Sequence, residues 1–188
     1  MLTKFKLKLF SIALVAIVMT LATQGTLAYY TVAARATNVV TMNGVKLKIH
    51  EKTNQGTNFP AEGIYIMPGD VVSKKVSIQN VCEEPFYLRV KMVYGVDAQP
   101  LSNEDCFKLN IDTENWKLVD GWYYYKEALS PEDTTSEVFT KVEIVGSQVD
   151  NRYLGKTLSI TVIAQAVQEK NNPIINNDTS TASGWPAN

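Results

Sequence analysis

The stretch FYLRVKMVY, residues 86–94, decides the fold class, because its side chains alternate in character. Every second position, from Phe86 to Tyr94, is apolar, and Arg89 and Lys91 stand between them; Val93 conforms less well. Successive side chains of a β-strand point to opposite faces, so this pattern is typical of a strand that buries one face. The stretch therefore predicts a β-strand at the edge of a hydrophobic core.

The same period of two recurs along the chain, and long helical periodicity does not. In GVKLKIH, residues 44–50, the apolar positions alternate with Lys46, Lys48 and His50. Further strands are predicted at Val71–Gln79, Phe107–Ile111, Trp122–Tyr125, Val138–Val145 and Leu158–Val167. Turn signals lie at Met67–Asp70, Gln99–Pro100, Ser130–Asp133 and Val145–Ser147. Many short strands between such turns predict an all-β fold, a single antiparallel β-sandwich or jelly roll spanning residues 41–169.

The first 28 residues have the pattern of a cleavable signal peptide. Three lysines precede an apolar stretch, Leu9–Ala22. This stretch is shorter than the roughly 20 residues that a helix needs to cross a bilayer. Thr26, Leu27 and Ala28 approximate a small-x-small cleavage site, so we expect the cut between Ala28 and Tyr29. An uncleaved membrane anchor is the alternative, and it is disfavoured because the next Lys or Arg after the stretch is Arg35.

The charge balance excludes polyanions as natural partners. The whole chain of 188 residues has a formal charge of -1, and removal of residues 1–28, with three lysines and no acid, leaves -4. A mildly acidic chain has no electrostatic reason to bind nucleic acid or an anionic membrane. We therefore expect no nucleic-acid partner, and contact with the membrane only through the signal peptide before cleavage.

Two cysteines, Cys82 and Cys106, reach an oxidising exterior if the chain is exported. One disulfide between them is a hypothesis, and two separate buried or reduced thiols are its alternative. The sequence alone does not decide between them, because bridging depends on the distance between the two Cα atoms.

Residues that could perform catalysis are few. The single histidine, His50, lies on the polar side of a predicted strand, and neither a zinc-ligand spacing nor a nucleophile motif accompanies it. We expect a non-enzymatic protein without metal or cofactor.

The aromatic run of the strand Trp122–Tyr125 is a candidate ligand or partner surface, because exposed Trp and Tyr stack on sugars or anchor interfaces. Alternation places Trp122 and Tyr124 on one face and Tyr123 and Tyr125 on the other, so one pair is expected to fill the core.

The end of the chain, residues 170–188, changes in composition to Asn, Ser, Thr and Pro. Such a composition is typical of a flexible tail. Trp185-Pro186 is unusual in this context and could dock on the domain or on a partner. Asn177-Asp178-Thr179 fits a glycosylation acceptor, a short pattern that requires a eukaryotic secretory pathway.

Several stretches in a fixed order resemble the TasA/camelysin (CalY) family of proteins exported by Gram-positive bacteria. They are GTLAYYT (25–31), ATNVVTMNGVKLKI (36–49), GIYIMPGDVVSKKVSIQN (63–80), YLRVKMVYG (87–95), GWYYYKEALSPEDTTSEVFTKVEI (121–144) and LGKTLSITVIAQAVQEKN (154–171). The resemblance covers nearly all of residues 1–170. This chain departs from the family in Cys82, in Asp133, where a Gly often follows the turn, and in its tail.

The resemblance implies a jelly-roll protein that a SipW-type signal peptidase processes and that is secreted to the extracellular matrix or cell surface. It further implies a homopolymer, a fibre of the biofilm matrix in which an N-terminal strand inserts into the next subunit. Residues 29–40, YYTVAARATNVV, suit that role because they are strand-prone and carry one charge, Arg35. Head-to-tail contacts of this kind do not close, so they produce filaments.

Two alternating sets make up the start of this donor segment: Tyr30, Val32 and Ala34, and Tyr29, Thr31 and Ala33. The sequence does not decide which set enters the groove. Residues 29–40 could also be the first strand of their own sandwich. The alternative functions are a monomeric surface binding module or adhesin, and a camelysin-like metalloprotease, which the lack of a recognisable zinc motif disfavours.

The assigned cleavage site predicts the effect of a bulky residue at position 28. An Ala28→Phe protein should stay uncleaved and membrane-retained, because the site accepts small side chains. Gel mobility of the cell-associated and secreted protein measures this. Normal secretion of the variant would refute the assignment.

Overall fold

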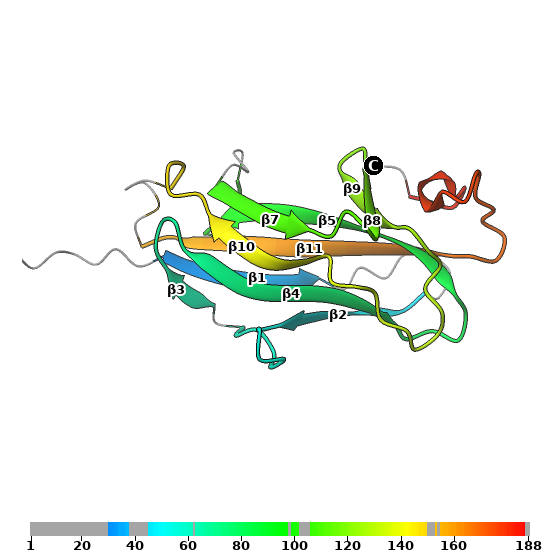
Figure 1. The fold of residues 1–188 in the computed structure, drawn as a ribbon, viewed down its shortest axis with the longest axis horizontal. Coiled ribbons are helices and arrows are strands. Elements are labelled where there is room, and N and C mark those ends of the chain that lie inside the picture. Colours follow the sequence, from blue (N-terminus) through cyan, green and yellow to red (C-terminus); the bar gives the residue numbers. More distant parts are fainter. Residues whose placement is uncertain are drawn as a thin grey trace, which may run out of the picture.

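The computed structural model describes residues 30–37, 45–61, 63–97, 99–101, 106–149, 153 and 155–186. Over these residues the protein is all-β, with two sheets and a short 3-10 helix, Thr179–Thr181, near the C-terminus (Figure 1). The predicted all-β class is confirmed. Within the described part of the chain no helix is long and apolar enough to cross a membrane.

The larger sheet has seven strands, in the order β3-β1-β11-β5-β9-β8, with β6 paired to β5. Its strands are β1 (Tyr30–Thr37), β3 (Ile64–Ile66), β5 (Phe86–Val96), β6 (Gln99–Pro100), β8 (Trp116–Val119), β9 (Trp122–Tyr125) and β11 (Thr157–Gln168). All its pairings are antiparallel except that between β1 and β11. The first strand therefore differs from the others in how it joins the sheet.

The smaller sheet has four strands, in the order β2-β4-β10-β7, all antiparallel. They are β2 (Leu47–Lys52), β4 (Val71–Asn80), β7 (Phe107–Ile111) and β10 (Phe139–Ile144). The sequence predicted seven of the strands near their observed bounds, namely β2, β4, β5, β7, β9, β10 and β11. It missed β3, β6 and β8, which are short.

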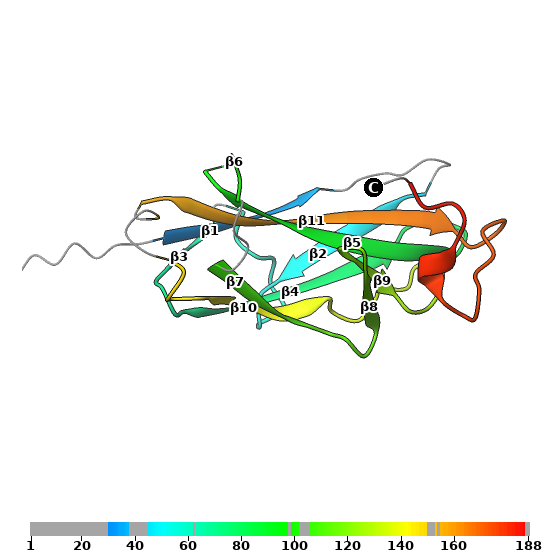
Figure 2. The same ribbon diagram turned by 90° about the horizontal axis from the view of Figure 1, so that it is seen from above.

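The longest ladder joins β5 to β11, and it runs along the length of the molecule (Figures 1 and 2). Its register is unbroken from Leu158 opposite Val96 to Gln168 opposite Phe86. Side chains on one face of both strands are buried in the core that the two sheets share. From this sheet the core receives Phe86, Leu88, Val90, Leu158, Ile160 and Val162, and from the other sheet Val76, Ile78, Phe139 and Val142.

Two tight turns position the strands around this core. Asp120 and Gly121 both have positive φ, 48° and 79°, as a two-residue hairpin turn between β8 and β9 requires. Between β3 and β4, Gly69 has φ 91° and the Asp70 carboxylate accepts a hydrogen bond of 2.6 Å from the Met67 backbone N–H. The turn predicted at Met67–Asp70 therefore closes on its own aspartate.

One charged pair is buried beside the core. The Lys74 side chain is 1% exposed, and its Nζ lies 2.7 Å from Glu51 Oε1 on the neighbouring strand β2. The ammonium group also lies 5.0 Å from the centroid of the Phe59 ring. Burial lowers the pKa of Lys74, and the attraction of Glu51 opposes this shift. The attraction between Lys74 and Glu51 therefore offsets the cost of removing each charge from water.

Glu51→Gln should destabilise the protein strongly, by about 3 kcal/mol near neutral pH, because it leaves the buried Lys74 ammonium without its counter-charge.

The unaltered protein should also show a pH dependence that comes from Lys74. Its pKa in the folded protein lies below the ordinary value of 10.5, so at pH values between these two pKa values the unfolded chain carries a proton on Lys74 that the folded chain lacks. The free energy of unfolding should therefore rise with pH in that window.

Urea denaturation at several pH values measures both effects. The matched control is Glu143→Gln, since Glu143 lies 3.9 Å from Lys108 and both side chains are exposed. It should change stability by less than about 1 kcal/mol. Equal losses in the two variants would contradict the assignment of Lys74 and Glu51 as a buried pair.

Candidate functional site

Strand β1 lies in its own chain's larger sheet, between β3 and β11. Thr31–Thr37 pair in parallel with Thr157–Ile163 of β11, and Tyr30–Val32 pair antiparallel with Ile64–Ile66 of β3. A parallel pair is slightly less stable per residue than an antiparallel one. We call the space between β3 and β11 the β1 slot.

The register distinguishes the two alternating sets of the N-terminal segment. Val32, Ala34 and Ala36 are the partners of Leu158, Ile160 and Val162, whose side chains are fully buried in the core. Tyr30 is the partner of the buried Ile66. Each residue of the set that begins with Tyr30 is therefore paired with a buried core residue of β3 or β11.

The other set occupies the alternate register positions. Thr31, Ala33 and Arg35 are opposite Thr157, Ser159 and Thr161, which are polar and only half-buried. The cleavage residues Thr26, Leu27, Ala28 and Tyr29 lie outside the described residues.

The two cysteines are both free thiols. Cys82 follows β4, and its Sγ contacts the backbone N–H and C=O of Lys46 at 2.7 and 3.0 Å. Cys106 is fully buried at the start of β7, with its Sγ 3.7 Å from the Gln148 carbonyl. The structure thus matches the alternative of two separate thiols and not the bridge.

The aromatic run of β9 divides between two faces of the larger sheet, as the alternation predicts. Tyr123 and Tyr125 pack against the core, and Tyr125 lies 5.0 Å from Trp116 between ring centroids. Trp122 and Tyr124 face the other way and are nevertheless buried, because the C-terminal segment covers this side. The run is therefore not an open aromatic surface.

A buried arginine lies at the centre of that covered face. Arg89 is 2% exposed, and its guanidinium lies 4.2 Å from the Trp122 ring, 5.8 Å from the Tyr124 ring and 5.0 Å from the Trp185 ring. It donates hydrogen bonds to Gln165 Oε1 at 2.6 and 2.8 Å and to the Tyr124 hydroxyl at 3.0 Å. We call Arg89, Trp122, Tyr124 and Gln165 the Arg89 box.

The C-terminal segment closes the box, and we call residues 169–186 the clasp. Arg89 donates to the Pro186 carbonyl at 2.8 Å, and Trp185 stands edge-on to Tyr124 with ring centroids 5.3 Å apart. The Trp185 indole N–H donates to the carbonyl of Thr179. Thr179 is itself buried, and its hydroxyl donates to the Tyr125 carbonyl at 2.7 Å.

The sequence predicted a flexible tail over residues 170–188, and the structure instead packs residues 170–186 on the sheet (Figure 2). A small apolar cluster accounts for part of the difference: Ala182 is buried against Tyr87 and Val167. A polar composition therefore did not exclude docking, because a few well-placed anchors suffice.

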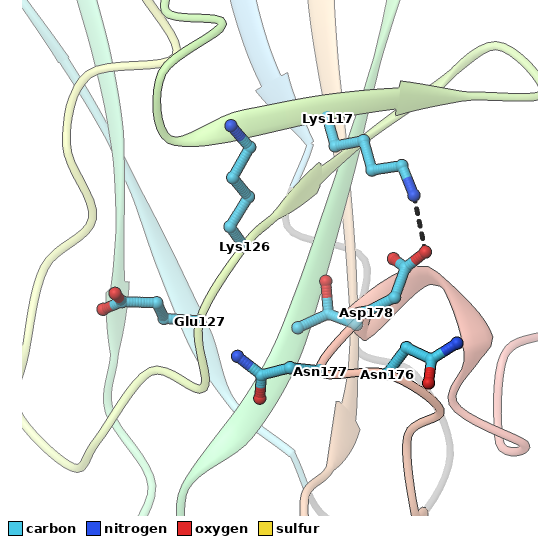
Figure 3. Close-up of a pocket in the computed structure, with 7 residues that line it drawn as sticks. Lys117, Lys126, Glu127, Asn176, Asn177 and Asp178 are labelled. Carbon is cyan, nitrogen blue, oxygen red and sulfur yellow. Dashed lines mark hydrogen bonds and ion pairs between the residues drawn. The ribbon is translucent and has the colours of Figure 1, made fainter.

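A shallow pocket of about 420 Å³ lies between the β8–β9 hairpin and the clasp (Figure 3). Its lining residues are Lys117, Lys126, Glu127, Asn176, Asn177, Asp178 and Thr179. Lys117 Nζ lies 2.5 Å from Asp178 Oδ2, and this hydrogen bond lowers the pKa of Asp178. The Lys126 ammonium donates to the carbonyls of Thr113 and Glu114. The two ammonium groups are thus already engaged, that of Lys117 by the clasp residue Asp178 and that of Lys126 by backbone carbonyls.

The described residues do not gather three or more His, Cys, Asp or Glu side chains into a group that could hold a metal ion. His50 lies half-buried on β2 with its Nε2 3.1 Å from Gln79 Oε1.

Comparison of the chain with known protein families, curated proteins and solved structures finds no match in any of the three.

The thiols predict an order of chemical labelling. Cys82 should react with iodoacetamide in the folded protein, whereas the fully buried Cys106 should react only after unfolding. Mass spectrometry of peptides from protein alkylated before and after denaturation measures this. An intact mass two hydrogens lighter, with neither thiol labelled, would instead establish a disulfide.

Proposed function

We propose that this protein is an exported structural subunit of jelly-roll type that forms extracellular or cell-surface fibres of a biofilm matrix. Assembly occurs when residues 30–37 of one copy enter the β1 slot of the next. A SipW-type signal peptidase frees the segment by cutting after Ala28. The resemblance to the TasA/camelysin family supports this role, together with the position of β1.

The single observation that carries the proposal is the nature of the β1 slot. On one side β11 presents a row of fully buried side chains, Leu158, Ile160 and Val162. A strand must cover them and satisfy the backbone of β11 at this edge. The strand that does so is the first of the described chain, and its departure breaks its ladders with β11 and β3 and leaves the other described ladders in place.

The pairing of β1 with β11 also favours exchange between copies. It is the one parallel pairing in the described sheets, and every other strand is held by antiparallel ladders. A neighbour's strand can satisfy the same backbone groups and bury the same apolar positions. Because the donor and the acceptor are different surfaces of one subunit, the contact is heterologous, and it extends into a filament when the rotation between successive copies does not close a ring.

The experiment compares protein that begins at Tyr29 with protein that begins at Thr41, by analytical ultracentrifugation and negative-stain electron microscopy. Filaments from the longer protein and folded monomers from the shorter one are expected. Monomers from the longer protein, with the shorter one unfolded, would mean that β1 serves only its own domain, and the binding-module alternative would then be tested.

A matched pair of substitutions tests the register. Ala34→Asp should abolish filaments, because position 34 is opposite the buried Ile160 and a carboxylate there would be desolvated. Ala33→Asp should still assemble, because position 33 is opposite the half-buried Ser159. Electron microscopy detects filaments of each variant, and circular dichroism shows whether each variant is folded. Equal behaviour of the two variants would refute the register, and an unfolded Ala34→Asp monomer would argue against donation.

A further inference from the structure

The Arg89 guanidinium is a buried charge whose described hydrogen bonds all go to neutral oxygen atoms. They belong to the Gln165 amide, the Tyr124 hydroxyl and the Pro186 carbonyl. Burial of a charged group is costly unless polar partners surround it, so each acceptor matters. The first two acceptors come from the sheet and the third from the clasp.

The sheet alone sets the geometry of the box. Arg89 is the register partner of Gln165 on β11 and of Tyr124 on β9, so three hydrogen-bonded strands fix these side chains. Trp122, also on β9, stacks on the guanidinium. The box is therefore built on three paired strands, and the clasp covers it and adds the third acceptor of Arg89.

The clasp fills the box as a bound peptide would. It supplies one aromatic anchor, Trp185, and one backbone carbonyl, that of Pro186, to the same guanidinium. An aromatic side chain in a desolvated pocket, with a hydrogen bond that fixes its register, is the usual energetic centre of a protein interface. The contacts thus define a site that recognises a folded segment with a Trp-Pro pair.

We propose that the Arg89 box is a peptide-binding site, occupied by the clasp of the same chain in an isolated copy and by the clasp of a second copy in an assembly. The second copy fits because it carries the same Trp185-Pro186 end. The connection also permits the exchange: Asn171, Asn176 and Asn177 are exposed residues with positive φ, 70°, 51° and 58°. A clasp that moves outward at these residues gives up the contacts of Thr179, Ala182 and Trp185, and the clasp of the second copy restores the same contacts.

Concentration decides which clasp occupies the box. A short tether holds a segment at an effective concentration in the millimolar range, so dilute copies keep their own clasp. Two copies held side by side present each other's clasp at a similar concentration, and exchange then costs little. The inference does not rest on the proposed function, since it requires proximity of two copies and not the β1 slot.

The first experiment uses the chain from Tyr29 onward with a protease recognition sequence inserted after Pro173, an exposed position. The protein folds intact and is then cut. A fluorescent peptide of residues 174–186 should bind the cut protein saturably in fluorescence anisotropy and should bind the uncut protein at least about tenfold more weakly, because the tethered clasp competes. Absence of saturable binding to cut protein of unchanged circular dichroism would overturn the proposal.

Two variant peptides identify the contact. A Trp185→Ala peptide should bind at least about tenfold more weakly, because it loses the aromatic anchor. An Ile175→Ala peptide should bind like the original, because Ile175 is 64% exposed. Equal affinity of all three peptides would show a nonspecific contact and would also overturn the proposal.

The second experiment tests exchange between copies. Full chains with Trp185→Ala, which vacates the box, and with Trp122→Ala, which weakens the box but keeps the clasp, are mixed and sedimented. We expect a 1:1 species that neither variant forms alone and that excess peptide of residues 174–186 dissolves. Strand insertion through the β1 slot would not respond to this peptide, so the two modes of assembly are distinguishable. A mixture that sediments as the sum of its components would refute exchange.

Discussion

The antiparallel ladder between β5 and β11 is the constraint on which the rest of the structure depends. Its register places Leu88 and Val90 in the core and, by alternation, Arg89 on the opposite face beside Gln165. A slip of one residue would exchange these faces and bury the guanidinium among aliphatic side chains. The edge of β11 that faces away from β5 forms one side of the β1 slot, and the edge of β5 that faces away from β11 pairs with β9. Both candidate sites are therefore consequences of one pairing.

The sequence predicted the strands that show sustained alternation and missed those too short to show any, such as Ile64–Ile66 and Gln99–Pro100. It could not give the parallel pairing of β1 with β11, because pairing between distant segments leaves no local pattern. Lys74 illustrates the same limit. Alternation assigns Lys74, and not Lys75, to the face of the buried Val76 and Ile78, but no local pattern pairs its charge with Glu51 or its ammonium group with the Phe59 ring.

The candidate sites were predictable in part. Alternation separated Trp122 and Tyr124 from Tyr123 and Tyr125 correctly, since a strand has only two faces. It did not identify Arg89, although a charged residue within an aromatic and aliphatic strand is the signal that could have found it. The docking of the clasp was missed because its composition is polar on average, whereas its anchors are single residues: Thr179, Ala182 and Trp185.

The two terminal segments complete surfaces that the middle of the chain leaves open. β1 covers one edge of β11, and the clasp covers the outer face of the neighbouring strands β5 and β9. β1 lies between β3 and β11 and the clasp lies on one face of the sheet, so either can move to another copy while the β5–β11 ladder and the smaller sheet stay intact. Under this proposal each subunit folds first and assembles later, because exchange replaces contacts one for one and leaves the core unchanged.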